Sequence, residues 1–219
     1  MSKQEMILAV EYAALVGQNL IGDDQQLYVC DFAEVFPHIQ HGVILGQREA
    51  LEKDETKRQF IPYVVFAKPD DGVVKFFAYR RGKGVGEARL NGNVSIGVGG
   101  HIDMADVISE SSVINMMATI QNSMVRELSE EIRLENAGEQ LNFGSLGVML
   151  ENSNTVGKTH VATVIMCTLP EEAKVNCAEA ELETLGFMTA KELLDSGLPL
   201  ENWTRILCEH FSALNGDAA

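Results

Sequence analysis

The stretch Arg126-Glu127-Leu128-Ser129-Glu130-Glu131 decides how this chain is interpreted. Side chains three and four positions apart lie on one face of a helix, so Glu127, Glu130 and Glu131 would share a face. Like charges stacked in this way weaken a helix, which indicates that a cation sits between them. Mg²⁺ (or Mn²⁺) prefers carboxylate oxygens and keeps water ligands for a phosphate substrate. The stretch therefore predicts a divalent metal site, and the alternative is an acidic helix face in solvent.

A short strand and a glycine turn come before this helix. Residues 94–98 have the composition of a strand, and they run into Gly99 and Gly100, where the backbone can approach an ion or a phosphate closely. A strand, a glycine turn and a helix with an Arg-Glu-x-x-Glu-Glu signature together resemble the Nudix hydrolases. The motif of that family is G-x5-E-x7-R-E-U-x-E-E-x-G-U, where U is an apolar residue.

The match to this motif contains an insertion. Gly100 to Leu134 covers 35 positions where the motif has 23, which is an insertion of 12. The position of the first glutamate is therefore ambiguous: counted from Gly100 it is Asp106, and counted back from Arg126 it is Ala118. The metal-binding half of the motif is intact, whereas the structural half is altered.

Two further departures from the motif concern residues that would stabilise the signature helix or orient its arginine. Arg133 replaces the last glycine of the motif. We expect Asp103, Asp106 or Glu110 to replace the missing acid that orients Arg126, and the sequence does not choose among them.

Composition and charge restrict the class of protein. With 219 residues, of which 46% are hydrophobic, the chain can bury the core of one ordinary domain. A net charge of −15 repels nucleic acid backbones, so a nucleic-acid-binding module is not expected. No apolar run is long enough to span a membrane, and residues 1–20 lack the basic start and cleavage site expected of a signal peptide. The four cysteines are scattered, which is typical of a reduced cytoplasmic protein.

A β-hairpin with a basic end is predicted upstream of the motif. Residues 61–67 and 73–79 read as strands, and residues 69–72 read as the turn between them. The second strand ends in Arg80 and Arg81, with Lys83 close behind, and these cations would offset the charge of an anionic substrate. The alternative is a flexible basic turn in solvent.

The signature helix is predicted to extend from about Ser111 to Arg133. Ser109, Ser111 and Ser112 are candidate N-caps, and apolar residues recur at helical spacing from Val113 to Leu128. The methionines in this stripe are interpreted as core residues.

The C-terminal part contains strands and a closing helix. Strands are predicted at residues 141–149 and 159–167, a strand followed by a short helix at 185–194, and an amphipathic helix at 203–214. His160 could face a substrate pocket, but a hydrogen-bonded structural histidine is the alternative. In the Nudix family an acid near the acidic stretch 171–183 often supplies a further metal ligand or base, and Glu179 or Glu181 is the candidate here.

The resemblance covers residues 60–194 and implies an α/β protein: a Nudix-type α/β/α sandwich with a mixed β-sheet, plus an N-terminal extension. The domain would occupy residues 60–215, and residues 1–59 would pack on it or form a dimer contact. By position, Glu127, Glu130, Glu131 and the Gly99 carbonyl would bind Mg²⁺ or Mn²⁺. Glu127 would be a ligand or the base, and Arg126 would hold the glutamates in place. The substrate would contact Gly100, Arg80 and Arg81.

The activity implied is hydrolysis of a nucleoside diphosphate linked to another group, by attack of water on phosphorus. The partner would be a small nucleotide-type molecule, and a homodimer is a family-level expectation. Residues 95–101 look most like a poorly characterised group described as predicted phosphoesterases. Two other functions remain open: a non-catalytic Nudix-like nucleotide-binding or sensor module, and an interaction protein in which the acidic helix is only surface.

Overall fold

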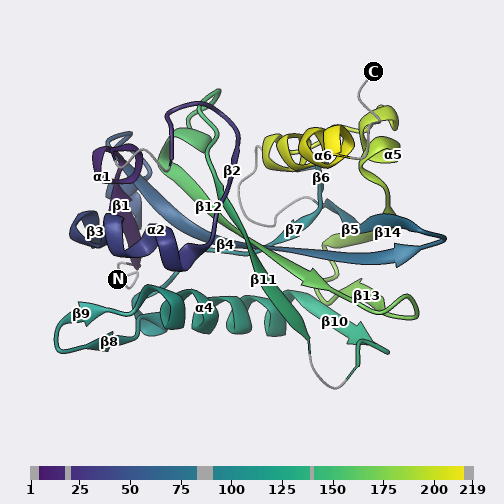
Figure 1. Cartoon of the computed structure of the whole chain (residues 1–219), viewed down its shortest axis with the longest axis horizontal. Helices are drawn as coiled ribbons and strands as arrows, with labels where there is room; N and C mark the ends of the chain where they lie inside the picture. Colours follow the sequence, from purple (N-terminus) through teal and green to yellow (C-terminus); the bar gives the residue numbers. More distant parts are fainter. Residues whose placement is uncertain (1–4, 18–20, 83–90, 139–140, 215–219) are drawn as a thin grey trace. The chain divides into compact units, whose positions relative to one another are not determined.

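The computed structural model describes residues 5–17, 21–82, 91–138 and 141–214, and Figure 1 shows its helices and strands. The chain divides into two units, each assembled from three segments. The first unit comprises Met1–Tyr63, Gly99–Glu127 and Ser145–Ile165, and the second comprises Val64–Val98, Leu128–Gly144 and Met166–Ala219. Four elements, β4, α4, β11 and β12, contribute residues to both units.

The first unit is organised around strands in the order β4-β12-β11-β2, with β1 paired to β4 and β3 paired to β1. Residues 58–67 of β4 are all buried, as expected for a continuous apolar strand with both faces covered. Its strands are β1 (Met6–Glu11), β2 (Leu27–Val29), β3 (Val43–Gln47), β4 (Lys57–Asp70), β8 (Ser109–Glu110), β9 (Val113–Ile114), β11 (Asn142–Met149) and β12 (His160–Thr168). Its helices are α1 (Tyr12–Val16), α2 (Phe32–Ile39), η1 (Gln40–Gly42), α3 (Arg48–Leu51), η3 (Met104–Asp106), η4 (Gly157–Thr159) and the first part of α4 (Met116–Glu131).

The N-terminal residues contribute a central strand of this unit. Residues 7–10 of β1 have no exposed surface. Ala9 pairs with Gln59 of β4, and the Leu8 N–H donates to the Ile102 carbonyl at 2.9 Å. Residues 7–10, for which the sequence predicted no strand, therefore lie in the core. The domain boundary between residues 59 and 60 stays a prediction.

The second unit has the strand order β14-β5-β4, with β6 paired to β5 and β7 paired to β4. The predicted hairpin is confirmed as β4 and β5, and its turn residues Asp71 and Gly72 have φ values of 49° and 80°. Two positive φ values match the twist of the flanking strands, and Asp-Gly adopts them readily. The other elements are β5 (Val73–Arg81), β6 (Val94–Ser95), β7 (Gly97–Val98), β10 (Ile132–Glu135), β13 (Lys174–Cys177), β14 (Leu182–Met188), α5 (Ala190–Asp195) and α6 (Asn202–Leu214).

The closing helix α6 packs on strand β5, as its amphipathic pattern predicts. Its Phe211 ring stacks on Phe76 of β5 with 4.6 Å between centroids, and Leu207 and Cys208 are fully buried. Burial of this apolar stripe stabilises the helix, because a helix of this length is marginal alone. Within the described ranges, none of the helices combines the length and the apolar character required to cross a membrane.

The prediction for the start of the signature helix is wrong. Helix α4 begins at Met116, not at Ser111, and the residues before it form the β8–β9 hairpin. Ser111 and Ser112 are the turn of this hairpin, with φ values of 49° and 67°, so they cannot be N-caps. Asn115 takes the capping position instead, because its Oδ1 accepts the Ala118 N–H at 3.1 Å. Apolar spacing does not distinguish a short hairpin from an extra helical turn.

The end of α4 also differs from the prediction. The helix ends at Glu131 rather than Arg133, and Ile132 begins strand β10, which pairs with β13. The Arg133 Nη1 donates to the carbonyls of Ser129 and Ile132, each at 2.9 Å. Basic side chains can satisfy the last carbonyls of a helix. Arg133 therefore caps the helix where the motif has glycine.

Candidate functional site

Arg126 of α4 joins three groups in the first unit. Its Nε and Nη2 donate to the two carboxylate oxygens of Asp106 at 3.0 and 2.7 Å, and its Nη1 donates to Glu127 Oε1 at 2.7 Å. Its Nη2 also donates to the carbonyl of His101 at 3.0 Å. The fork of a guanidinium matches a carboxylate in this bidentate way. Of the three candidate acids, Asp106 is therefore the one that contacts Arg126.

The short helix η3 holds the Asp106 carboxylate in position for this contact. Its carboxylate accepts the Asp103 N–H at 3.0 Å in a capping box with Asp103. Burial would raise the pKa of Asp106, but the hydrogen bonds from Arg126 and from the Asp103 N–H, with the charge of Arg126, outweigh it and hold this pKa below its usual value. Asp106 is consequently an anion that keeps Arg126 in place.

Glu127 lies directly against the glycine turn. A Cβ atom added at Gly100 would overlap with Glu127 Oε1, and one added at Gly99 would overlap with the Pro62 carbonyl oxygen. In both cases the added Cβ would be much closer to the oxygen atom than a van der Waals contact allows. The two glycines therefore let backbone and carboxylate approach each other, as the sequence suggested for this turn.

The two glycines should respond differently to substitution by alanine. In Gly99→Ala the new methyl group meets fixed backbone, so we expect the free energy of unfolding to fall by about 3 kcal/mol. In Gly100→Ala it meets the movable end of Glu127, so we expect a loss of about 1 kcal/mol but a fall in any turnover of about 100-fold, because the carboxylate is displaced. Urea denaturation and steady-state kinetics measure the two effects. Equal effects of both variants on stability would contradict this account.

A pair of histidines lies beside the turn. The Nε2 atoms of His101 and His160 are 3.1 Å apart, and the His160 Nδ1 is 2.7 Å from the Val156 carbonyl oxygen. Because a carbonyl only accepts, His160 carries its proton on Nδ1, and its Nε2 accepts from His101 Nε2. Both ring nitrogens of His160 are thus hydrogen-bonded, and its side chain is buried. This is the geometry expected of the structural alternative for His160.

The histidine pair predicts acid sensitivity. Burial, then the charges of Arg48 and His160, lower the pKa of His101 to about 3. A histidine in the unfolded chain titrates at about pH 6.5. Below that pH, the unfolded state therefore binds a proton that the folded state does not bind. Stability should therefore fall as the pH drops from about 6.5, by up to about 1.4 kcal/mol per pH unit. Urea denaturation between pH 7 and 4.5 tests this, with His101→Gln expected to flatten the slope and the exposed His38→Gln as the matched control.

The two arginines at the end of β5 have different surroundings in the second unit. Arg80 makes a surface ion pair with Glu183 at 2.9 Å, with side chains 35% and 60% exposed. Arg81 makes an ion pair with Glu201 at 2.5 Å, with side chains only 13% and 7% exposed. Lys83 lies outside the described residues. Because side chains alternate along a strand, Arg80 and Arg81 point to opposite faces, and Arg81 is on the buried one.

Glu131 and Glu179 both act on Cys177 in this unit. Burial raises the pKa of the Cys177 thiol, and the charges of Glu131 and Glu179 raise it further. The Glu131 carbonyl accepts the Ala178 N–H at 2.7 Å, which ties the end of α4 to this segment. Of the two candidate acids from the acidic stretch, Glu179 is therefore the one that shares the surroundings of Glu131, whereas Glu181 is exposed.

The donors available for a metal are hard oxygen atoms. Helix α4 carries Glu127, Glu130 and Glu131 near its end, and Glu130 is exposed whereas Glu127 is buried. Carboxylate and carbonyl oxygens are the ligands that Mg²⁺ and Mn²⁺ prefer. The space that Gly100 leaves for the Glu127 carboxylate gives one such donor a fixed place beside the turn. The donor chemistry thus fits a divalent cation.

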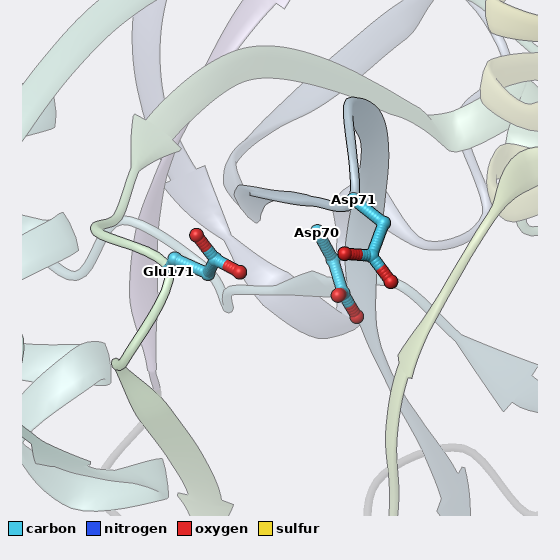
Figure 2. A group of neighbouring side chains, drawn as sticks. All are labelled: Asp70, Asp71 and Glu171. Carbon is cyan, nitrogen blue, oxygen red and sulfur yellow. The ribbon is translucent and has the colours of Figure 1, made fainter.

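A different acidic group comes closest together. Among the described residues, the three ligating side chains whose donor atoms all lie within 4.8 Å of one another are those of Asp70, Asp71 and Glu171, shown in Figure 2. Asp70 is paired with Lys75 at 2.7 Å, and this hydrogen bond lowers the pKa of Asp70. Asp70 and Asp71 lie at the turn of the β4–β5 hairpin, and Asp70 already has a lysine partner. We therefore interpret the group as an ordinary cluster of surface carboxylates.

Comparison with known proteins identifies the fold. No protein-family profile matches the chain. Protein YmaB of Bacillus subtilis (strain 168) is 27% identical over 198 residues, which cover 90% of this chain and 89% of YmaB. The crystal structure of Tm1382, assigned provisionally as a Nudix hydrolase, matches with a TM-score of 0.71 at 21% identity over 96% of this chain and 100% of Tm1382. The chain has the Nudix fold. A NUDIX hydrolase from Alicyclobacillus acidocaldarius matches with a TM-score of 0.50 at 14% identity over 71% of this chain and 91% of that one.

This Nudix fold accommodates the insertion ahead of α4. Residues 109–114, which form the β8–β9 hairpin, lie between Asp106 and the start of the helix. Counting from Gly100 gives Asp106, the acid that contacts Arg126, whereas counting back from Arg126 gives Ala118, which has no charge. No spacing pattern in the sequence marks the contact of the His101 carbonyl with Arg126 or that of Glu201 with Arg81.

Proposed function

We propose that this protein is a Mg²⁺- or Mn²⁺-dependent pyrophosphohydrolase that cleaves a nucleoside diphosphate-linked small molecule. The observation that carries the proposal is the arrangement of Arg126 between Asp106 and Glu127, with the Glu127 carboxylate against Gly100. A merely solvated acidic helix has no need of a buried acid that orients its arginine. The arrangement instead supports a role in which the position of Glu127 matters.

The metal would be held by the carboxylates of Glu127, Glu130 and Glu131, with the Gly99 carbonyl. When bound, it would neutralise developing charge on the phosphoryl group and lower the pKa of a water molecule. Glu127 would serve as a ligand or would take the proton of that water, and Arg126 would keep its carboxylate oriented. We propose Glu179, which like Glu131 acts on Cys177, as the further acid.

Binding of the substrate would rely on Arg80 and Arg81 at the end of β5. Glu201 engages only the Nε of Arg81, and a guanidinium has five N–H donors, so the terminal nitrogens can face a phosphate. Arg80 donates to Glu183 through Nη1 in a surface ion pair, so its other N–H donors can likewise face a phosphate. Gly100 would let the phosphates approach the backbone. Such cations are needed because the net charge of −15 opposes the approach of a nucleotide.

A non-catalytic nucleotide-binding module is the second candidate. It was suggested by the altered motif, namely Ala118 and Arg133. Two contacts make these departures a weaker argument for a non-catalytic module. Asp106 provides the acid that contacts Arg126, and Arg133 caps α4 in place of the glycine of the motif. Tight binding of a nucleotide without hydrolysis would favour this second function.

A hydrolysis screen tests the proposal. The panel contains dinucleoside polyphosphates, nucleotide sugars, ADP-ribose, NADH, coenzyme A and nucleoside triphosphates, each with Mg²⁺ or Mn²⁺ and with EDTA. Metal-dependent release of phosphate or a nucleoside monophosphate is the expected result. No turnover across the panel, together with a melting temperature that Mn²⁺ does not change, would overturn it.

A further inference from the structure

Arg58 of β4 is a buried cation in the first unit. Only 3% of its surface is exposed, and its Nη2 donates to Asn152 Oδ1 at 2.9 Å. Its Nε and Nη1 atoms are also buried, and they have no hydrogen-bond partner among the described residues. Arg48 and Arg126 of the same unit, in contrast, each donate to two carboxylates. Arg58 therefore differs from them in that its hydrogen-bond partner is neutral.

The acids that act on Arg58 through their charge are engaged by other groups. Glu55 forms an ion pair with Lys158 at 3.7 Å, and Glu151 Oε1 accepts both the N–H and the hydroxyl of Ser153. Burial lowers the pKa of Arg58, and the opposing contributions of its neighbours do not outweigh this effect. The positive charge of Arg58 is therefore not fully compensated within the described part of the unit.

Stability alone does not account for this arginine. A buried cation without a hydrogen-bonded counter-ion loses its hydration and gains little in return. The ring of Tyr12, whose centroid is 4.3 Å from Arg58 Cζ, offsets part of that cost through a cation–π contact. An apolar side chain of similar length would fill the same space without the cost. Residues that reduce stability in this way are typical of sites that bind a ligand.

The shape of the guanidinium indicates which ligand would fit. It has two edges with a pair of parallel N–H groups each, one formed by Nε and Nη2 and the other by Nη1 and Nη2. Nη2 places one N–H on each edge, and Asn152 Oδ1 accepts one of the two. Whichever N–H Asn152 accepts, the other edge retains two donors without a described acceptor. Two parallel donors match the two oxygens of a carboxylate or a phosphate.

Charge balance favours a carboxylate over a phosphate. One carboxylate balances the single charge of Arg58, whereas a phosphate group, with a charge of about −1.5 to −2 at pH 7, would leave excess negative charge buried. Access is short, because Tyr12 and Asn152 are both partly exposed and residues 153–155 are exposed. The guanidinium thus lies beneath one layer of side chains, and movement of these side chains would admit a small anion.

We propose that Arg58, with Tyr12 and Asn152, binds the carboxylate group of a small molecule. The carboxylate would accept from the available edge of the guanidinium, while Tyr12 covers its face and Asn152 fixes its orientation. This site is separate from the proposed metal site. Arg58 lies four residues along β4 from Pro62, the residue whose carbonyl faces Gly99, and that separation is about 13 Å in a strand. The inference therefore does not rest on the proposed hydrolase function.

The test uses acetate as the probe. The melting temperature is measured at pH 7 in sodium acetate, sodium phosphate and sodium chloride of equal ionic strength. We expect acetate to raise the melting temperature of the wild type by about 3 °C over chloride, the size that binding at several times the dissociation constant gives. Arg58→Met should lose this rise, and in chloride it should melt no lower than the wild type. Arg48→Met, at an ion-paired surface arginine of the same unit, is the matched control and should keep the rise.

Nuclear magnetic resonance observes the binding directly. The ¹⁵N signal of the Arg58 Nε–H group is assigned by its absence from the spectrum of Arg58→Met. Titration with acetate should shift this signal, whereas equal additions of chloride should not, because a hydrogen bond to an anion changes the surroundings of the guanidinium.

Three results would overturn the proposal. The first is a wild type whose melting temperature does not respond to acetate, which is decisive even if Arg58→Met fails to fold. The second is a lower melting temperature of Arg58→Met in chloride together with an unchanged response to acetate, which would make Arg58 a structural cation. The third is a larger response to phosphate than to acetate, which would contradict the assignment to a carboxylate. None of these results depends on whether the protein hydrolyses a nucleotide.

Discussion

Replacing Glu130 with glutamine should abolish metal-stimulated hydrolysis while the protein stays folded. Glutamine keeps the size of the side chain but removes the negative charge and one ligand oxygen, so we expect turnover to fall at least about 100-fold. Glu130 is exposed on α4, and substitutions at such positions usually change stability by less than about 0.5 kcal/mol. The measurement is turnover with Mn²⁺, alongside the melting temperature with and without Mn²⁺.

Glu135→Gln is the matched control for this variant. Glu135 is an exposed glutamate of β10, just beyond the end of α4, and it is near Lys174 at 4.0 Å. It should retain both turnover and the Mn²⁺-dependent rise in melting temperature. Wild-type turnover in Glu130→Gln would mean that the metal is not bound by the helix. Loss of turnover in both variants would point to the general negative charge of this surface instead.

Replacing Arg126 with alanine should destabilise the protein far more than replacing the surface residue Arg80. Asp106 and Glu127 have side chains 6% and 12% exposed, and both depend on Arg126 for a positive partner. Removing one partner of a buried ion pair leaves uncompensated charge, and the expected cost is about 3–5 kcal/mol. Turnover should also be lost, because Glu127 is no longer oriented. Urea denaturation at pH 7 measures the change in the free energy of unfolding.

The dependence on pH and a comparison variant make this prediction specific. The pKa of Asp106 is lowered in the folded protein, so its ionisation stabilises the wild type above about pH 4, and that contribution is lost as the pH falls through the folded pKa. The difference between wild type and Arg126→Ala should therefore shrink as the pH falls below about 4. Arg80→Ala breaks only a surface pair and should cost less than about 1 kcal/mol. Equal losses in Arg80→Ala and Arg126→Ala would show that burial of the carboxylates does not matter.

The local sequence determined the elements whose signals are short-range. The Asp71-Gly72 turn defines a hairpin because few residue pairs accept two positive φ values, and the structure has that hairpin. Glu127, Glu130 and Glu131 share a helix because their spacing and neighbours favour one. The family resemblance came from the same six residues and two glycines, and the fold agrees with it. These features depend on neighbours in sequence, so no knowledge of distant contacts was required.

Only the tertiary structure decided which distant residues meet. The partner of Arg126 could be chosen only when η3 and the β8–β9 hairpin placed Asp106 against α4, because an insertion changes every count along the sequence. The pairing of Arg81 with Glu201, which are 120 positions apart, depends on where α6 begins beside β6. The start of α4 at Met116 likewise depends on a hairpin whose apolar spacing imitates a helix. Charge pairs across such separations leave no periodic trace in sequence, because each is set by packing rather than by local conformational preference.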